Sequence, residues 1–294
     1  MTKTTSKTLM ANTALNNNNQ SVGIIGCGWL GTALATQLLA KNISVLATSS
    51  KVENVETLKQ QSITAQQLIL PASNESELAQ HGVFTQKNLV IAITPQFKQG
   101  RKDYADKIIQ LINTAQQQGL VERIILLSSS AIYDGLAGQV YEDSVINTTS
   151  EKAQILNAAE QAVLNFTQQG LVLRLAGLVG PERHPGKFLL ANKTLSNATA
   201  PVNLIHQQDA VGLIEALLQS ELCGGIFNGV SSTQVTKKQY YQAAAKALQL
   251  PTPTFDETEL ALENAPKVVS GKKTQAALAY SFAYDDLLTW LERA

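Results

Sequence analysis

A cluster of glycines near residue 26 constrains the fold of this chain more than any other feature. Residues 22–31 read Val-Gly-Ile-Ile-Gly-Cys-Gly-Trp-Leu-Gly, so a short apolar strand leads into Gly-x-Gly-x-x-Gly and then into a helical pattern. In a dinucleotide-binding turn, the first glycine (Gly26) permits a tight bend, Gly28 leaves room for a pyrophosphate, and Gly31 lets the helix approach the strand. The phosphates bind to free N–H groups at the helix N-terminus. The predicted contacts of a dinucleotide in this turn are Gly26, Cys27, Gly28, Trp29, Leu30 and Gly31.

The next apolar strand, residues 43–47, is followed by Thr48, Ser49, Ser50 and Lys51. NAD sites of this type carry an acidic residue near this place, which binds the ribose 2′-hydroxyl, whereas a 2′-phosphate needs a cationic or hydrogen-bond-donating surrounding. Hydroxyls and a lysine stand here in place of an acid. This pattern favours NADP as the cofactor, with NAD as the alternative. In a structural interpretation, the same polar residues form a solvated loop that caps a helix over residues 52–60.

The composition excludes several classes of partner. The 294 residues are 44% hydrophobic, enough for a substantial core in one large domain or two smaller ones. Lys plus Arg and Asp plus Glu both number 23, so the chain lacks the basic character typical of nucleic-acid binding. Residues 1–20 are polar and are predicted to be a flexible tail, and no segment approaches the roughly 18 apolar residues that a membrane span needs. We expect a soluble, cytoplasmic protein that binds neither nucleic acid nor membrane.

The cysteines and histidines predict no metal site. Cys27 and Cys223 lie far apart and match no disulfide framework or metal-ligand spacing, and His81 lies in a separate loop. Cys27 lies in the glycine turn, where a helix N-terminus can lower a thiol pKa. We favour the alternative that Cys27 is a small buried space-filler, because free cysteine is among the residues most often buried.

Strand and helix patterns alternate along the rest of the chain. Strands are predicted at residues 65–70, 88–93, 123–128, 171–175 and 225–228, and a short extended segment at 203–206. Helices are predicted at residues 103–118, 150–168, 210–219, 236–250 and 284–293. Gly170 is expected to end the second of these helices, and Asp209 to cap the third. Such alternation predicts an α/β fold with a doubly wound parallel sheet, a Rossmann fold.

This fold class predicts where a ligand binds. Ligands of doubly wound sheets lie beyond the carboxyl ends of the strands, so the glycine turn, Thr94, Pro95 and Ser128 are expected to surround one crevice. The predicted dinucleotide-binding domain comprises residues 21–180 and 200–230. A smaller substrate lobe is predicted to comprise residues 181–199 and 231–294.

Three further segments carry recognisable motifs. These are Ser-Ser-Ser-Ala-Ile-Tyr-Asp-Gly at residues 128–135, Leu-Arg-Leu-Ala-Gly-Leu-Val-Gly-Pro at 173–181, and His206-Gln-Gln-Asp209. In this order they resemble the Ser-Ser-x-x-Val-Tyr-Gly, Arg-x-x-x-x-Tyr-Gly-Pro and His-x-x-Asp segments of the extended short-chain dehydrogenases/reductases. That class includes sugar-nucleotide epimerases and dehydratases. The resemblance covers nearly all of residues 21–293 and implies an NAD(P)-dependent oxidoreductase, epimerase or dehydratase.

Two features depart from the family pattern. The family has Gly-x-x-Gly-x-x-Gly where this chain has Gly-x-Gly-x-x-Gly, a change that still leaves room for a pyrophosphate. The family's catalytic Tyr-x-x-x-Lys is missing: Lys152 stands at the tyrosine position and Leu156 at the lysine position, and none of the seven tyrosines is followed by lysine four residues later. That tyrosine delivers a proton to the developing alkoxide, because the neighbouring lysine and the cofactor lower its pKa. The chain therefore resembles an atypical member that lacks the standard active site.

Four residues are candidates for the remaining chemistry: Ser129, Tyr133, Arg183 and His184. Ser129, at the family's catalytic Ser/Thr position, either orients a substrate carbonyl or satisfies backbone groups in a turn. Tyr133 is a substitute acid or, as we favour, a packing residue, and Arg174 is expected to be structural. Arg183 suits a carboxylate or phosphate and His184 can transfer protons near neutral pH, unless their loop is only a polar surface.

The leading functional prediction is an oxidoreductase or epimerase that acts on a small polar, anionic substrate. The rival prediction is an NADP-binding redox sensor with weak or no catalysis, and a third is a scaffold whose glycine turn is vestigial. Helices 103–118 and 150–168 resemble the pair that forms the dimer interface in many extended relatives. The second helix carries more apolar residues than one buried face needs: Ile155, Leu156, Ala159, Val163 and Phe166. A homodimer is therefore predicted as well.

Overall fold

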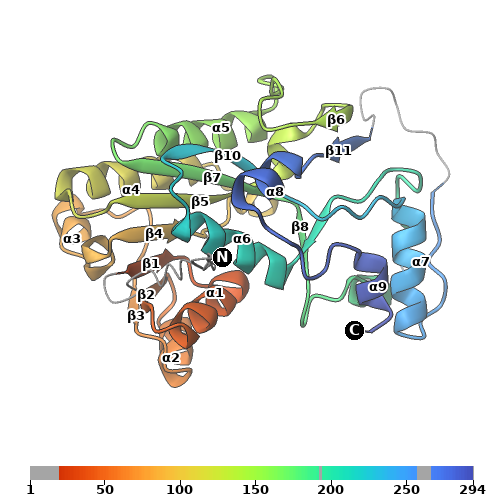
Figure 1. The fold of residues 1–294 in the computed structure, drawn as a ribbon, viewed down its shortest axis with the longest axis horizontal. Coiled ribbons are helices and arrows are strands. Elements are labelled where there is room, and N and C mark those ends of the chain that lie inside the picture. Colours follow the sequence, from red (N-terminus) through yellow and green to blue (C-terminus); the bar gives the residue numbers. More distant parts are fainter. Residues whose placement is uncertain (1–19, 192–193, 257–265, 294) are drawn as a thin grey trace, which may run out of the picture.

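A seven-stranded parallel sheet forms the centre of the molecule in a computed structural model that describes residues 20–191, 194–256 and 266–293 (Figure 1). The strands follow the order β10-β7-β5-β4-β1-β2-β3 and are all parallel. From β1 the chain adds β2 and β3 on one side, and then crosses over to add β4, β5, β7 and β10 on the other side. Their bounds are Ser21–Ile25 (β1), Ser44–Ser49 (β2), Ala65–Gln67 (β3), Asn88–Ile91 (β4), Arg123–Ser129 (β5), Gln169–Leu175 (β7) and Gly224–Gly229 (β10). The predicted doubly wound Rossmann fold is confirmed.

Helices cover both faces of this sheet. The helices and turns of the sheet domain are α1 (Trp29–Ala40), α2 (Val52–Gln60), α3 (Glu75–Ala79), α4 (Tyr104–Gln118), α5 (Glu151–Leu164), α6 (Gln207–Gln219) and the 3₁₀ turns Gly82–Thr85, Phe97–Gln99 and Ser130–Tyr133. Helix α4 packs beside α5, and α1 packs beside α6. Both α5 and α6 contact β5 and β7, from opposite faces of the sheet (Figure 1). The central strands are consequently buried on both sides and read as continuous apolar runs.

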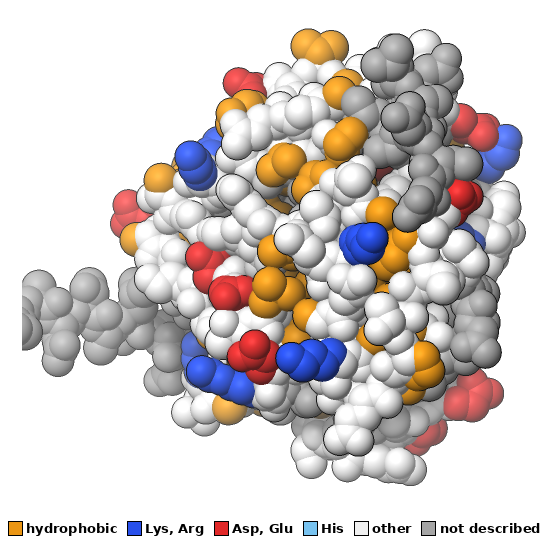
Figure 2. All heavy atoms as spheres, turned by 90° about the vertical axis from the view of Figure 1, so that its right-hand side faces the viewer, with side chains coloured by type: hydrophobic (Ala, Val, Ile, Leu, Met, Phe, Trp, Pro, Cys, Tyr) orange, Lys and Arg blue, Asp and Glu red, His pale blue; other side chains and the backbone are white. Residues whose placement is uncertain are grey.

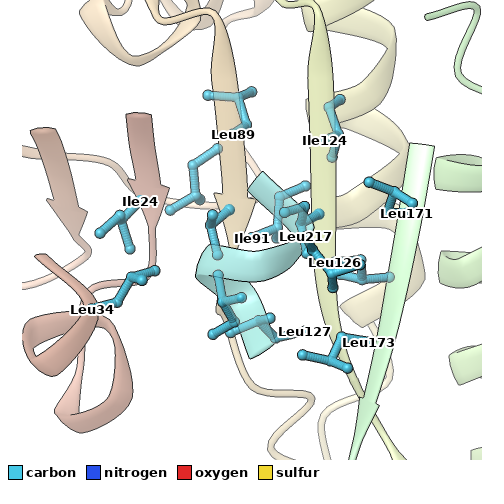
Figure 3. Packing of buried hydrophobic residues seen from close by; sticks show 14 of the residues in the cluster. Ile24, Leu34, Leu89, Ile91, Ile124, Leu126, Leu127, Leu171, Leu173 and Leu217 are labelled. Carbon is cyan, nitrogen blue, oxygen red and sulfur yellow. The ribbon is translucent and has the colours of Figure 1, made fainter. Parts of the chain in front are cut away.

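The main core lies between the sheet and these helices. Figure 3 shows buried side chains on both faces of the sheet: Leu173 of β7 lies on the face that α6 covers with Leu217, and Leu89 and Ile91 of β4 and Leu126 of β5 lie on the opposite face. All of these side chains are completely buried. Helix α5 also approaches β7 very closely, because a Cβ on Gly170 would lie 1.9 Å from the backbone oxygen of Val163.

A smaller group of elements packs against the carboxyl edge of the sheet. It contains two short parallel ribbons and three helices: β8 (Gly177–Val179) with β9 (Leu204–His206), β6 (Gly138–Val140) with β11 (Lys267–Val269), α7 (Lys237–Ala247), α8 (Lys272–Leu278), α9 (Leu287–Leu291) and the 3₁₀ segment Pro185–Ala191. Helices α7 and α9 lie side by side, away from the sheet (Figure 1). Val179, Tyr240 and Trp290 belong to a second hydrophobic cluster in this part of the molecule.

Several predicted element boundaries differ from the structure. The helix predicted at residues 150–168 ends at Leu164, and Gly170 lies inside β7, where the close approach of α5 requires a glycine. The predicted strand 65–70 is shorter, ending at Gln67, and the helix predicted at 284–293 spans Leu287–Leu291. The helix predicted at 236–250 spans Lys237–Ala247, with Thr236 and Gln239 forming a capping box.

The prediction that Asp209 caps α6 is wrong. The N-cap is His206, whose Nδ1 accepts a hydrogen bond from the backbone N–H of Gln208 at 3.2 Å. Asp209 is completely buried, and its carboxylate accepts the backbone N–H groups of Ala283 and Tyr284 at 2.7 and 2.9 Å. Asp209 therefore fastens the C-terminal segment to α6.

Two further features are the distribution of charge on the surface and the character of the helices. On the face seen in Figure 2, Lys and Arg side chains alternate with Asp and Glu among the described residues, so neither sign of charge dominates there. Across residues 20–191, 194–256 and 266–293, no helix combines the length and apolar character that a membrane crossing requires.

Candidate functional site

A large pocket of about 740 Å³ opens at the carboxyl ends of the central strands. It brings together the turn after β1, the end of β2, the loop after β4, the end of β5 and the segment after β7. The predicted crevice residues that line it are Gly26, Cys27, Gly28, Trp29, Leu30, Gly31, Thr48, Ser49, Ser50, Thr94, Pro95, Ser128, Ser129 and Arg183. Lys51, Tyr133 and His184 are not among the residues that line it.

The three glycines of the turn differ in their surroundings. Gly26 has φ of +88°, and a Cβ there would lie 2.6 Å from Cγ2 of Ile93. Gly31 packs α1 onto β1, because its Cβ would lie 3.3 Å from Cγ2 of Ile24. A Cβ on Gly28, by contrast, would meet nothing within 4 Å. Gly28 thus faces open space in the pocket at the N-cap of α1.

The N-terminus of α1 is electrostatically available to an anion. Its N-cap Gly28 supplies no side-chain hydrogen bond, and its first turn contains no acidic residue. Free N–H groups and the helix dipole there favour negative charge. This is the arrangement that binds phosphate at the start of a helix.

The end of β2 presents hydroxyl groups to the pocket. Thr48 is buried, and its Oγ1 accepts the backbone N–H of Gly26 at 3.3 Å. Oγ of Ser49 accepts the backbone N–H of Lys51 at 3.4 Å, and Ser50 is exposed at the rim. Lys51 is itself exposed at the N-cap of α2 and lies outside the pocket lining.

The charged side chains that line the pocket are all cationic among the described residues. They are Arg101, Lys107 and Arg183, with no Asp or Glu in the lining. Arg101 and Lys107 share the carboxylate of Asp103, at 2.7 and 3.0 Å. The guanidinium of Arg183 lies 4.2 Å above the ring of Trp29, an arrangement that holds it beside the glycine turn. The pocket therefore favours an anionic ligand.

The inner end of the pocket contains the serines that follow β5. Oγ of Ser129 accepts the backbone N–H of Ala131 at 3.1 Å. Ser128 donates to the buried carboxylate of Glu160 at 2.5 Å. Leu156, at the family's lysine position, lines the pocket beside them, whereas Lys152 forms a 2.7 Å ion pair with Asp134.

Tyr133 lies in a buried polar network behind the pocket. Its hydroxyl donates to Oδ1 of Asn228 at 2.8 Å and accepts from Nη1 of Arg174 at 2.7 Å. Arg174 also forms a 2.7 Å ion pair with Glu160, and both side chains are almost fully buried. The geometry gives Tyr133 and Arg174 packing and structural roles, and burial raises the pKa of Tyr133.

Arg183 and His184 are neighbours in sequence but line different cavities. Arg183 faces the large pocket, and His184 lines a second cavity beside it. Nδ1 of His184 accepts the backbone N–H of Gly186 at 3.1 Å, and burial lowers the pKa of its imidazole. The structure therefore does not bring His184 to Ser129.

Cys27 is a buried residue of the glycine turn with an unreactive environment. It is 4% exposed, and its burial raises the pKa of the thiol to about 11. The alternative of a thiol with a lowered pKa is wrong, because desolvation outweighs any effect of the helix N-terminus.

Sequence reasoning missed several polar residues that line the pocket, namely Asn54, Gln96, Arg101, Tyr104 and Lys107. Tyr104 is 1% exposed, and its hydroxyl has no hydrogen-bond partner in the described part of the chain. Tyr104 and Lys107 are three residues apart at the start of α4, directly after the loop that follows β4. That spacing places both on one helix face, a signal that was available in the sequence.

Within the ranges that the structure describes, no group of three or more His, Cys, Asp or Glu side chains is arranged to hold a metal ion.

Comparisons with known proteins agree with this geometry. Residues 21–97, which contain the glycine turn, match the family model of the coenzyme F420-dependent NADP oxidoreductases. Over 273 residues the chain is 29% identical to Protein YeeZ of Escherichia coli (strain K12), covering 92% of this chain and 98% of YeeZ.

Two solved structures illustrate the likeness in fold. A functionally unknown conserved protein from Silicibacter pomeroyi DSS has a TM-score of 0.76 at 18% identity, over 93% of this chain and 97% of that one. UDP-glucuronic acid 4-epimerase from Bacillus cereus, in complex with NAD, has a TM-score of 0.74 at 17% identity, over 93% of this chain and 96% of that one. The fold is thus that of the epimerase/dehydratase proteins along nearly the whole chain. In its three motifs, its glycine-turn domain and its fold the chain therefore resembles the extended short-chain dehydrogenases/reductases of the epimerase/dehydratase type, and it departs from their pattern in lacking Tyr-x-x-x-Lys.

Proposed function

We propose that the chain is a nicotinamide-dinucleotide-binding oxidoreductase or epimerase and that it prefers NADP(H). The observation that carries this proposal is the pocket itself, which joins an uncapped helix N-terminus, open space at Gly28 and a lining with three cations and no carboxylate. A dinucleotide needs these features, because its pyrophosphate is anionic and approaches the backbone closely. The residues present therefore fit the group.

The end of β2 supports the preference for NADP(H). Thr48, Ser49 and Ser50 line the pocket there, and the described lining lacks the carboxylate that would bind a ribose 2′-hydroxyl. A 2′-phosphate would bind near Ser49 and Ser50, with Asn54 as a further polar contact. Lys51 contributes only if its exposed side chain turns toward the phosphate. The matched family model describes NADP oxidoreductases, which agrees with this preference.

The inner end of the pocket is the proposed substrate site. A nicotinamide cofactor supplies hydride transfer there when it is bound. Ser129 orients the substrate oxygen, and Arg183 binds an anionic substituent, because a guanidinium forms paired hydrogen bonds with carboxylate or phosphate. Related folds include proteins described as UDP-glucuronic acid 4-epimerase and UDP-glucose 4-epimerase, whose named substrates are anionic.

Tyr104 is the proposed proton donor in place of the missing family tyrosine. It lies in the pocket lining with Ser128, Ser129 and Leu156, and its hydroxyl has no other partner among the described residues. Burial, with a contribution from Glu160, raises the pKa of this phenol, so it keeps its proton at neutral pH but is a weaker acid than the activated tyrosine of the family. A protonated donor suits the reduction direction, in which a substrate oxygen gains a proton. An unpartnered buried hydroxyl costs about 1–3 kcal/mol, a cost that a ligand would relieve.

The second candidate is an NADP-binding redox sensor with weak or no turnover. The pairing of Lys152 with Asp134 and the burial of Tyr133 favour it, because neither side chain is free to replace the family's catalytic pair. Both candidates share the same cofactor site and differ only in chemistry.

Calorimetric titration with NADPH and NADH tests the cofactor proposal. We expect saturable binding with a lower Kd for NADPH, and a selective loss of NADPH affinity in Ser50→Asp, because the new carboxylate repels a 2′-phosphate. Equal affinities for both cofactors, or an unchanged preference in Ser50→Asp, would contradict the NADP assignment.

A substrate panel followed by NADPH absorbance separates the enzyme from the sensor. On any substrate found, Tyr104→Phe should lower kcat by about 100-fold or more, which is the usual contribution of general acid catalysis. Tyr240→Phe is the matched control, since Tyr240 is another buried phenol whose hydroxyl has no partner in the described residues, outside the pocket lining. If both variants turn over normally, Tyr104 is not the donor. If NADPH binds and no substrate reacts, the sensor becomes the leading function.

A further inference from the structure

A second cavity, of about 420 Å³, lies beside the cofactor pocket. It is formed by residues 180–187, the start of α6, the end of α7 and the α9 region, and it shares no lining residue with the large pocket. The segment that contains Arg183 and His184 separates the two cavities. The described residues that line this cavity are Gly180, Pro181, Glu182, His184, Lys187, His206, Gln207, Gln208, Leu248, Tyr284 and Trp290.

The two histidines of this cavity have defined tautomers. Nδ1 of His184 accepts the backbone N–H of Gly186 at 3.1 Å, and Nδ1 of His206 accepts that of Gln208 at 3.2 Å. Burial lowers the pKa of both imidazoles, so both are neutral near pH 7. A neutral imidazole that accepts at Nδ1 carries its proton on Nε2. Each histidine is therefore an N–H donor at Nε2, and this nitrogen is not available as a metal ligand.

One of these donors is unsatisfied. His184 is 7% exposed, and its Nε2 has no hydrogen-bond partner in the part of the chain that the structure describes. A buried donor without an acceptor is rare in native proteins and costs about 1–3 kcal/mol. An acceptor atom of a ligand would remove this cost.

The walls of the cavity are aromatic and apolar. Trp290 contacts both histidines, with ring centroids 5.7 Å from His184 and 5.1 Å from His206. The ring of Tyr284 lies 4.0 Å from His206, and Leu248 adds an aliphatic surface. Flat rings in such surroundings stack a planar ligand.

The lining carries one charge of each sign, and the unsatisfied N–H of His184 is the feature that favours an anionic acceptor. Lys187 lines it, and α6, a helix of 13 residues, begins there with Gln207 and Gln208. The nearby carboxylate of Asp209 is already bound to backbone N–H groups of Ala283 and Tyr284. Glu182 also lines the cavity, and Glu182 and Lys187 are both exposed at its rim.

We propose that this second cavity binds a small ring-bearing carboxylate. The carboxylate accepts the Nε2 hydrogen of His184 near the N-terminus of α6 and the ammonium of Lys187, and the ring packs against Trp290. This inference does not depend on the cofactor proposal, because it uses none of the same residues.

Tryptophan fluorescence provides a direct test, because Trp29 and Trp290 are the two tryptophans of the chain. The probe is benzoate, with benzyl alcohol as the control that keeps the ring and lacks the charge. We expect a saturable change with benzoate that persists in Trp29→Phe and disappears in Trp290→Phe. A response of equal affinity to benzyl alcohol, or no saturable response to benzoate, would overturn the proposal.

Two variants separate this cavity from the cofactor pocket. His184→Leu should weaken benzoate binding by about tenfold, the usual effect of one charge-assisted hydrogen bond. Gly28→Asp, which blocks the other pocket, should leave benzoate binding unchanged. Displacement of benzoate by NADPH would place the probe in the wrong pocket and reject the assignment.

A measurement on the unmodified chain covers the case in which His184→Leu does not fold. Imidazole ¹⁵N NMR of the wild-type protein should show the Nε2–H resonance of one histidine moving as benzoate saturates the site. Histidine resonances that stay fixed throughout the titration would reject the hydrogen bond on which the proposal depends.

Discussion

At the residue scale, the surroundings of a side chain decide its chemistry more than its position in a motif. Cys27 lies in the glycine turn, where a helix N-terminus could activate a thiol, yet burial dominates and raises its pKa to about 11. Arg183 and His184 are adjacent, yet they face different cavities. Ser129 and Tyr133 are four residues apart, and only Ser129 lines the pocket.

Thiol labelling tests the account of Cys27. At pH 7.5 a maleimide should react with one cysteine per folded chain, because Cys223 is exposed, whereas Cys27 is buried and protonated. Cys223→Ser should then react only after unfolding. Rapid labelling of folded Cys223→Ser would show that Cys27 is accessible as a thiolate and contradict the structure.

At the scale of secondary-structure elements, a buried ion pair joins α5 to β7. Glu160 of α5 and Arg174 of β7 are paired at 2.7 Å, and Ser128 of β5 donates to the same carboxylate. A buried ion pair adds little net stability, but removal of one partner leaves an uncompensated charge. The pair therefore fixes how α5 sits on the sheet, close to the pocket.

Glu160→Gln should destabilise the fold by about 3–5 kcal/mol in urea denaturation, because Arg174 would stay buried without its counter-ion. Glu151→Gln is the matched control on the same helix. Glu151 pairs with Lys102 at 2.6 Å on the surface, where such a pair is worth about 0–1 kcal/mol. Similar losses in both variants would mean that the buried network does not hold α5.

The sequence predicted most of the elements and missed what depends on tertiary contacts. Most strands, their parallel arrangement and the crevice at their carboxyl ends followed from apolar runs, glycine spacing and the rule for doubly wound sheets. The role of Asp209 could not be predicted, because its partners Ala283 and Tyr284 lie more than seventy residues away. Gly170 was predicted as a helix stop, since nothing local reveals the approach of the Val163 carbonyl. Tyr104 was missed because it fits an apolar helix position: its spacing from Lys107 was visible in the sequence, but no motif marks an unpartnered hydroxyl.

At the scale of the whole molecule, buried histidines make the stability depend on pH. Burial lowers the pKa of His206 in the folded chain from 6.5 to about 4. Between these values the unfolded chain binds more protons than the folded chain, so the free energy of unfolding falls as the pH drops from 6.5 to 4. The contribution of neutral His206 to the free energy of unfolding is fully present above pH 6.5. His184, whose pKa is also lowered, adds to the same trend.

His206→Asn isolates this effect, because asparagine is a good N-cap residue for α6 and does not titrate. Urea denaturation at pH 7.5 and pH 4.5 should show a smaller loss of stability in the variant than in the wild type. Equal losses in both proteins would mean that His206 does not titrate on unfolding.

The oligomeric state is a second property at this scale. The apolar residues that suggested a homodimer are mostly used within one chain. In α5, Leu156, Ala159 and Val163 are buried and Ile155 is partly covered, and Phe166, which follows the helix, is also buried. The homodimer stays a prediction. Light scattering at micromolar concentration should report about twice the chain mass of 31.6 kDa, and a value near 31.6 kDa would reject it.

The central claim is that the glycine turn binds a dinucleotide. Calorimetry with NADPH on wild type, Gly28→Ala and Gly28→Asp tests it most directly, because side-chain atoms at this position enter open space and leave the fold intact. We expect saturable binding to wild type, weaker binding to the alanine variant and none to the aspartate variant, whose carboxylate would meet the pyrophosphate. Circular dichroism should be identical for all three. Wild-type NADPH affinity in a folded Gly28→Asp protein would contradict the claim.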